Sequence, residues 1–242
     1  MAETIEFSPP GYARLMAALR ARKYEMRSFA AADPGKRHLI VRHDVDFSLE
    51  AASAMAEQER ELRFSSTYFI LLRTEFYNPL SRHGLQALRR IVDCGHEIGL
   101  HFDAALYSGG RVEVEGAIAH ECALLESAIG GSVSAISFHR PAADHIGEAD
   151  RLAGRLNAYG PRFVKDMGYC SDSRGAWHHG EPLNHPAVRE GRALQLLVHP
   201  LWWQHPAMAP AERLKAFLAQ REDFLDWELA RHCTVHKART GQ

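Results

Sequence analysis

Short apolar runs alternate with amphipathic stretches along most of this 242-residue sequence, and this alternation restricts its fold more than any other feature. Residues 38–42 (HLIVR) and 66–72 (STYFILL) have the length and the β-branched or aromatic content of buried strands. Residues 48–63, between them, have the apolar spacing of a helix. Such repeated strand–helix units favour a parallel sheet, open or closed into a barrel, with helices outside it.

The same pattern continues toward the C-terminus, with no Gly/Ser-rich linker and no internal repeat to divide the chain. Its length suits one α/β domain, so we expect a single domain over residues 1–242. The predicted strands are 24–28, 38–42, 66–72, 96–100, 134–139, 167–171 and 193–199. The predicted helices are 10–22, 48–63, 83–94, 112–129, 148–159 and 210–230.

Charge and composition argue against several classes of protein. The 29 Lys and Arg residues nearly balance the 30 Asp and Glu residues, and no basic block stands out, so we expect no nucleic-acid partner. The N-terminal residues do not resemble a signal peptide and no stretch is long enough to span a bilayer, so we expect a cytoplasmic protein without a membrane span. The cysteines are too widely separated for a structural zinc knot or a disulfide framework: Cys94, Cys122, Cys170 and Cys233.

Polar side chains follow the predicted strands at the points where those strands end. The C-terminal ends of parallel strands converge on one face of such a sheet, and that face is where these folds place their binding sites. We therefore expect these residues to lie around one cavity. They are His43, Asp44, Asp46, His101, Asp103, His139, Arg140, Asp172 and His199.

The sequence RHDVD (42–46) predicts a metal site. Side chains at positions i and i+2 of an extended chain point the same way, so Asp44 and Asp46 can face one cavity. Two carboxylates so close need a cation, and His101 offers an imidazole that zinc and its first-row neighbours accept. In the alternative interpretation, Asp44 caps the helix that begins near Ser48 and Asp46 is a solvated loop residue. The histidines at the other strand ends favour the metal site.

Five motifs, in this order, resemble those of the polysaccharide deacetylase (NodB-homology, carbohydrate esterase family 4-like) family, in its cytosolic "RHDVD" branch. The resemblance covers residues 38–203. It implies a distorted (β/α) barrel of about seven strands, with the N-terminal and C-terminal helices packed on it. The motifs are RHDVD (42–46), GHEIGLHFDA (95–104), FHRPA (138–142), SDSRGAW (171–177) and LLVHP (196–200).

The resemblance implies a divalent metal cofactor, most simply Zn²⁺, with Asp46 and His101 as ligands. The family's second motif normally supplies another histidine four residues after the first, but this chain has Ala105 there. The third ligand is therefore open: Asp103, His139 or water could fill the place, or the site could bind metal poorly.

The resemblance also implies catalytic roles for four residues. Asp44 would be the general base and His199 the general acid, with Asp44 and Asp46 assigned to base and ligand by their order alone. Arg140 would hold Asp44 in place, and Asp172 would orient a partner such as His199 or Arg140.

Aromatic residues near the motifs could bind substrate. Trp177, in the fourth motif, is the first candidate for a pocket wall, and Tyr77 follows a predicted strand end. Trp202 could stack on a sugar ring, or it could simply close the barrel.

The resemblance implies a metal-dependent hydrolase that removes an N-acetyl group from a sugar or glycan precursor. Two alternatives stay open: a deacetylase-like binding or scaffold protein with a weakened metal site, and a hydrolase of a non-sugar, cyclic amide. The sequence does not predict the oligomeric state.

Overall fold

One curled, largely parallel sheet forms the centre of the protein, in a computed structural model that describes residues 5–108, 110–141, 145–178 and 180–239. The strands follow one another in the order β6-β7-β5-β4-β3-β2-β9-β8, and β1 pairs with β2. Only the β6–β7 pair is antiparallel among the strands described. The strands are β1 (Glu25–Met26), β2 (His38–Val45), β3 (Thr67–Leu71), β4 (Glu97–Phe102), β5 (Ala135–Phe138), β6 (Arg151–Leu152), β7 (Arg155–Asn157), β8 (Gly168–Ser171) and β9 (Leu194–Val198).

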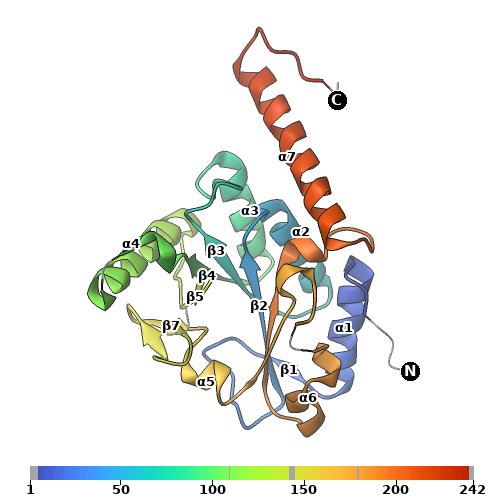
Figure 1. Ribbon diagram of the computed structural model, residues 1–242, viewed down its shortest axis with the longest axis vertical. Coiled ribbons are helices and arrows are strands. Elements are labelled where there is room, and N and C mark those ends of the chain that lie inside the picture. Colours follow the sequence, from blue (N-terminus) through green and yellow to red (C-terminus); the bar gives the residue numbers. More distant parts are fainter. Residues whose placement is uncertain (1–4, 109, 142–144, 179, 240–242) are drawn as a thin grey trace.

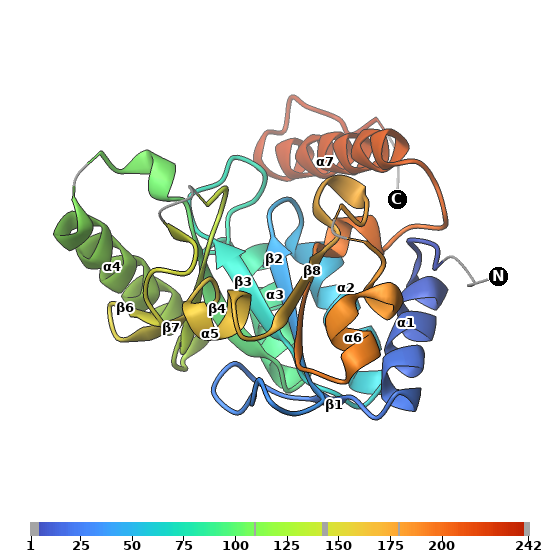
Figure 2. The ribbon, with the colours of Figure 1, turned by 60° about the horizontal axis from the view of Figure 1, so that its bottom comes forward.

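Helices surround this sheet (Figures 1 and 2). Ser8, Ser48 and Ser81 cap three of them, each accepting a hydrogen bond from a backbone N–H of the first turn. The helices are α1 (Pro9–Ala21), α2 (Leu49–Glu61), α3 (Arg82–Asp93), α4 (Arg111–Ile129), α5 (Pro161–Val164), α6 (Pro186–Glu190) and α7 (Pro210–His232). Short 3₁₀ turns are η1 (Ala104–Leu106), η3 (Ser173–Gly175), η4 (Pro182–Asn184) and η5 (Pro200–Trp202).

The central strand β2 is buried along its whole length and divides the core into two layers. Val41 and Val45 belong to the large cluster beneath the helices, whereas Ile40 packs with Phe69 and Phe163 in a second cluster on the other face. Because side chains alternate along a strand, Arg42 and Asp44 share the face of Ile40. The first carboxylate of RHDVD therefore points away from the helical layer.

The structure confirms the predicted α/β fold with a parallel sheet and outer helices. Each of the seven predicted strands is present. The edge strands β6 and β8 do not pair with each other in the described sheet, so the barrel is open on one side and forms a half-barrel.

The helix predicted at residues 148–159 is wrong. These residues form the β6–β7 hairpin, beside α4 at one edge of the sheet (Figure 2), and β7 extends the parallel sheet from β5. Ala153 and Gly154 make a two-residue turn with φ values of 46° and 78°. Two successive positive φ values match the right-handed twist of a hairpin, so turn geometry and sheet pairing override the helical periodicity.

The C-terminal helix α7 extends past the body of the domain (Figure 1). It contacts the body through Phe217, through Arg213, which donates to Phe7 O, and through Glu228, which lies 3.1 Å from His83, while Leu218 and Leu225 remain exposed. Over the described ranges, no helix is both long enough and apolar enough to cross a bilayer.

Candidate metal and catalytic site

Six of the nine strand-end residues line a cavity of about 590 Å³, namely Asp44, Asp46, His101, His139, Arg140 and His199. His43, Asp103 and Asp172 are not in its lining. Asp46 follows β2, His101 lies near the end of β4, His139 follows β5 and His199 follows β9. These strands are parallel, so their C-terminal ends meet at the same edge of the sheet. The sheet thus brings together residues that are up to 153 positions apart in the sequence.

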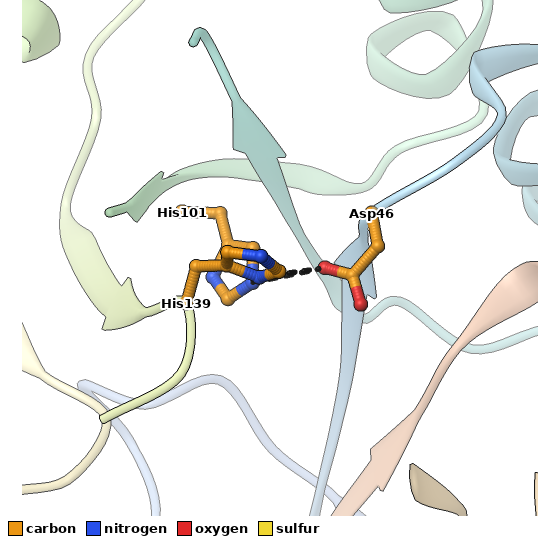
Figure 3. Close-up of side chains that lie close together, drawn as sticks. All are labelled: Asp46, His101 and His139. Carbon is orange, nitrogen blue, oxygen red and sulfur yellow. Dashed lines mark hydrogen bonds and ion pairs between the residues drawn. The ribbon is translucent and has the colours of Figure 1, made fainter. Parts of the chain in front are cut away.

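Asp46, His101 and His139 form a compact group of possible metal ligands (Figure 3). His101 Nε2 lies 3.1 Å from Asp46 Oδ1, and His139 Nδ1 lies 3.3 Å from the same oxygen. The two imidazole nitrogens are 3.2 Å apart. Ligands of one zinc ion lie about 2.0–2.1 Å from it and therefore about 3 Å from one another. The three donor atoms fit a single divalent ion.

The hydrogen bonds of His101 favour the tautomer that a metal requires. Ser137 Oγ donates to Asp44 Oδ1 at 3.3 Å, so it accepts from His101 Nδ1–H at 2.8 Å. This leaves a lone pair on His101 Nε2 directed at the Asp46 carboxylate, an arrangement that calls for a proton or a metal ion between them. Burial alone would raise the pKa of Asp46, but the imidazoles of His101 and His139 beside it hold that pKa well below its usual range.

Of the two candidates for the third ligand, the structure places His139 in the cluster. Asp103 instead accepts a hydrogen bond from Arg140 Nη2 at 2.5 Å and from the backbone N–H of Ala105. His139 follows β5 and does not belong to the motif that contains Ala105, so a histidine from the neighbouring strand lies where it could serve as the third ligand.

The expected contact between Arg140 and Asp44 is wrong, and Arg42 makes it instead. The Arg42 guanidinium is fully buried and donates to Asp44 Oδ2 at 2.8 Å. It also donates to Tyr159 Oη at 2.9 Å and to Gln195 Oε1 at 3.1 Å. Arg42 lies two residues before Asp44 and shares its face of β2. Arg140 has a φ of 52° just beyond β5, and its side chain is 67% exposed.

Arg42 also explains why Asp44 is ionised in a buried position. Burial by itself would raise the pKa of Asp44, but the nearby Arg42, His101 and His199 hold it below its usual value. An ionised carboxylate that faces the cavity can accept a proton.

His199 is held by Asp172, one of the two arrangements expected from the sequence. Asp172 Oδ1 lies 2.6 Å from His199 Nδ1, and its Oδ2 accepts a hydrogen bond from Trp203 Nε1 at 2.7 Å. His199 Nε2 faces the metal cluster, 3.7 Å from Asp46 Oδ2. Burial would lower the pKa of His199, but Asp172, Asp46 and Asp44 raise it to about 9. The same cavity thus holds the His199 imidazole, with a raised pKa, and the Asp44 carboxylate, with a lowered pKa, so the two side chains carry opposite charges.

The three aromatic candidates lie in different places. Trp202 lines the site cavity. Tyr77 lines a different cavity, and its hydroxyl donates to Val45 O at 2.6 Å, which holds the end of β2 in place. Trp177 packs against Phe7 and Trp203, with ring centroids 5.5 and 6.0 Å away. The expected pocket positions of Tyr77 and Trp177 are therefore wrong, since both are used to pack loops.

Alternation along β2 separates His43 from the site, although it belongs to the RHDVD motif. Its Nε2 lies 2.8 Å from Glu59 Oε1 beneath α2.

The sequence interpretation missed Arg42, Ser137 and Tyr159. For Arg42 a signal existed, because the i, i+2 rule that pairs Asp44 with Asp46 also places Arg42 beside Asp44.

We expect the Arg42→Met substitution to lower the free energy of unfolding by about 3–5 kcal/mol, because it leaves the Asp44 carboxylate buried without its counter-ion. Adding Asp44→Asn to this variant should restore part of the loss. Urea denaturation of both proteins measures the effect. Arg89→Met, which alters an exposed arginine on α3, should change stability by less than about 0.5 kcal/mol. Equal losses in the Arg42 and Arg89 variants would contradict the assignment.

Comparisons with known proteins give only distant structural likenesses. No protein-family model matches the chain, and no curated protein matches it. The solved structures that it resembles include *Streptococcus pyogenes* deacetylase PplD in complex with acetate, with 12% identity, a TM-score of 0.44, and coverage of 88% of this chain and 89% of that one.

Two further solved structures give likenesses of the same kind. A family 4 acetyl xylan esterase from *Clostridium thermocellum* in complex with a cobalt ion has 16% identity, a TM-score of 0.38, and coverage of 76% of this chain and 83% of that one. A mutant of BA3943, a CE4 family pseudoenzyme with restored enzymatic activity, has 15% identity and a TM-score of 0.43, with 78% of this chain covered. This chain spans 63% of that pseudoenzyme. At such scores none of these likenesses assigns a ligand or an activity to this chain.

Proposed function

We propose that the protein is a metal-dependent hydrolase that removes an N-acetyl group from a sugar or glycan precursor. The observation that carries the proposal is the convergence, in one cavity, of a three-donor cluster with a carboxylate and an imidazole of opposite charge. Asp44 has the properties of a base and His199 those of an acid. Amide hydrolysis needs both, because a proton must leave the attacking water and another must reach the departing amine.

Asp46, His101 and His139 would hold the metal, with Zn²⁺ as the proposed ion. When bound, such an ion supplies polarisation of the amide carbonyl and a lowered pKa for water. The donor set supports the fit, because it combines one carboxylate oxygen with two imidazole nitrogens about 3 Å apart.

The remaining steps belong to the side chains themselves. Asp44, held by Arg42 on Oδ2, would take a proton from the attacking water. His199, with Nδ1 fixed by Asp172, would present Nε2–H to the amide nitrogen and protonate it as the C–N bond breaks. The products are acetate and a free amine, and transfer of the proton from Asp44 back to His199 through solvent restores the starting state.

The finer parts of the proposal concern where the protein acts and on what. Membership of the "RHDVD" branch and a cytoplasmic location are proposals, as is the choice of a glycan precursor rather than assembled polymer. A cyclic amide is an alternative substrate for the same cavity. The binding-protein alternative rested on Ala105, and the position of His139 beside His101 weakens that reason.

An assay of released product tests the proposal. Zinc-loaded and chelator-treated protein would be incubated with N-acetylated sugars, nucleotide-linked N-acetyl sugars and small cyclic amides, and acetate and amine would be quantified. We expect product from an N-acetylated sugar with the loaded protein and at least about a hundredfold less after chelation. A loaded protein that releases nothing from the whole panel would favour the binding protein, and release from cyclic amides alone would change the substrate.

A further inference from the structure

Two arginines with unusual backbone conformations line the site cavity. Arg140 and Arg174 have φ values of 52° and 59°, in the left-handed region that residues other than glycine seldom adopt. They are two of five such residues in the part of the chain that the structure describes. Backbone strain of this kind persists where the surroundings enforce it, and it concentrates at functional sites.

The two guanidinium groups differ in their partners. Arg140 is paired with Asp103 at 2.5 Å. Arg174 is exposed, and across the described residues no carboxylate lies within ion-pair distance of it. The carboxylates deeper in the cavity are already engaged, Asp44 by Arg42 and Asp46 by two histidines. The positive charge of Arg174 is therefore uncompensated at a cavity whose acids are occupied.

Much of the remaining lining is apolar or aromatic and offers a bound molecule little charge: Phe47, Phe138, Ile146, Val164, Leu197 and Trp202. In such surroundings a single guanidinium contributes strongly to the choice of bound molecule, because its planar fork of N–H donors matches a phosphate or a carboxylate group.

We propose that Arg174 is a specificity residue that binds an anionic substituent of the substrate, a phosphate or a carboxylate, at a position away from the amide to be hydrolysed. This inference rests on the proposed function. It narrows the substrate class from N-acetylated sugars in general to those that carry such an anion.

Calorimetric titration tests the inference without requiring turnover. The zinc-loaded Asp44→Asn protein would be titrated with N-acetylglucosamine, N-acetylglucosamine 6-phosphate and N-acetylmuramic acid, which carry no charge, a phosphate and a carboxylate. We expect at least one anionic sugar to bind about tenfold more tightly than the neutral one. Adding Arg174→Gln should bring that ratio close to one, and Arg174→Lys should restore part of it. The matched control Arg89→Gln, at an exposed arginine of α3, should leave the ratio unchanged.

Which anionic sugar binds more tightly distinguishes a phosphate from a carboxylate. Equal binding of neutral and anionic sugars, a ratio that survives Arg174→Gln, or no binding of any sugar would each overturn the inference. The failure of the proposed function is seen separately, as a wild-type protein that releases no acetate although it is loaded with metal.

Discussion

Replacing Asp44 by asparagine is expected to lower the turnover of the zinc-loaded protein by about a thousandfold while leaving its metal content unchanged. An asparagine can still accept the hydrogen bond from Arg42 on its amide oxygen, and its amide nitrogen can donate to Ser137 Oγ, so the local structure should survive. It cannot take up a proton, which is the role proposed for Asp44. The measurement is kcat for the best substrate of the panel, with zinc determined by elemental analysis on the same samples.

Asp93→Asn provides the matched control, because it makes the same chemical change at an exposed position on α3. It should leave both turnover and metal content unchanged. If the Asp44 variant kept the turnover of the wild type, Asp44 would have no part in the mechanism, and Asp46 would have to be reconsidered as the base.

The sequence predicted that these side chains would lie together at one edge of the sheet, because that inference needs only strand ends and the alternation of side chains. The apolar run before RHDVD identifies β2, and the i, i+2 spacing places Asp44 and Asp46 on one face. His101 and His199 follow two other strands, and parallel strands bring all these ends to one edge.

The third donor could not be chosen from the sequence because it depends on the register between strands. His101 lies opposite Ser137 in the β4–β5 pairing. His139, two residues beyond Ser137, therefore continues on the same side and comes within 3.2 Å of His101. The register between β4 and β5 cannot be inferred from the motif spacing or from the position of Ala105.

The contact assigned to Arg140 failed for a different reason. A motif indicates that an arginine lies near the site, but its backbone conformation decides which carboxylate it reaches. Arg140 has a left-handed φ, and its guanidinium contacts Asp103. Arg42 lies in the extended strand β2, and its guanidinium contacts Asp44. Tyr77 is a second case in which the motif position did not predict the contact. Its hydroxyl donates a hydrogen bond to the backbone carbonyl of Val45 and does not face the site cavity.

The second large effect concerns the metal itself. Replacing His139 by alanine removes one of the three donor atoms and should reduce zinc affinity by more than the roughly 10–100-fold that loss of a supporting hydrogen bond costs. Asp103→Asn is the matched comparison, because Asp103 was the other candidate for the third ligand and lies outside the cluster. Its zinc affinity should stay close to that of the wild type.

Metal content per chain tests the central claim most directly. Wild type, His139→Ala and Asp103→Asn would be stripped with chelator, reconstituted with zinc, passed through a desalting column and analysed for bound metal. We expect close to one zinc ion per chain in the wild type and in Asp103→Asn, and almost none in His139→Ala. A wild-type protein that retains no zinc, or a His139→Ala protein that retains as much as the wild type, would contradict the assignment of Asp46, His101 and His139 as the metal site.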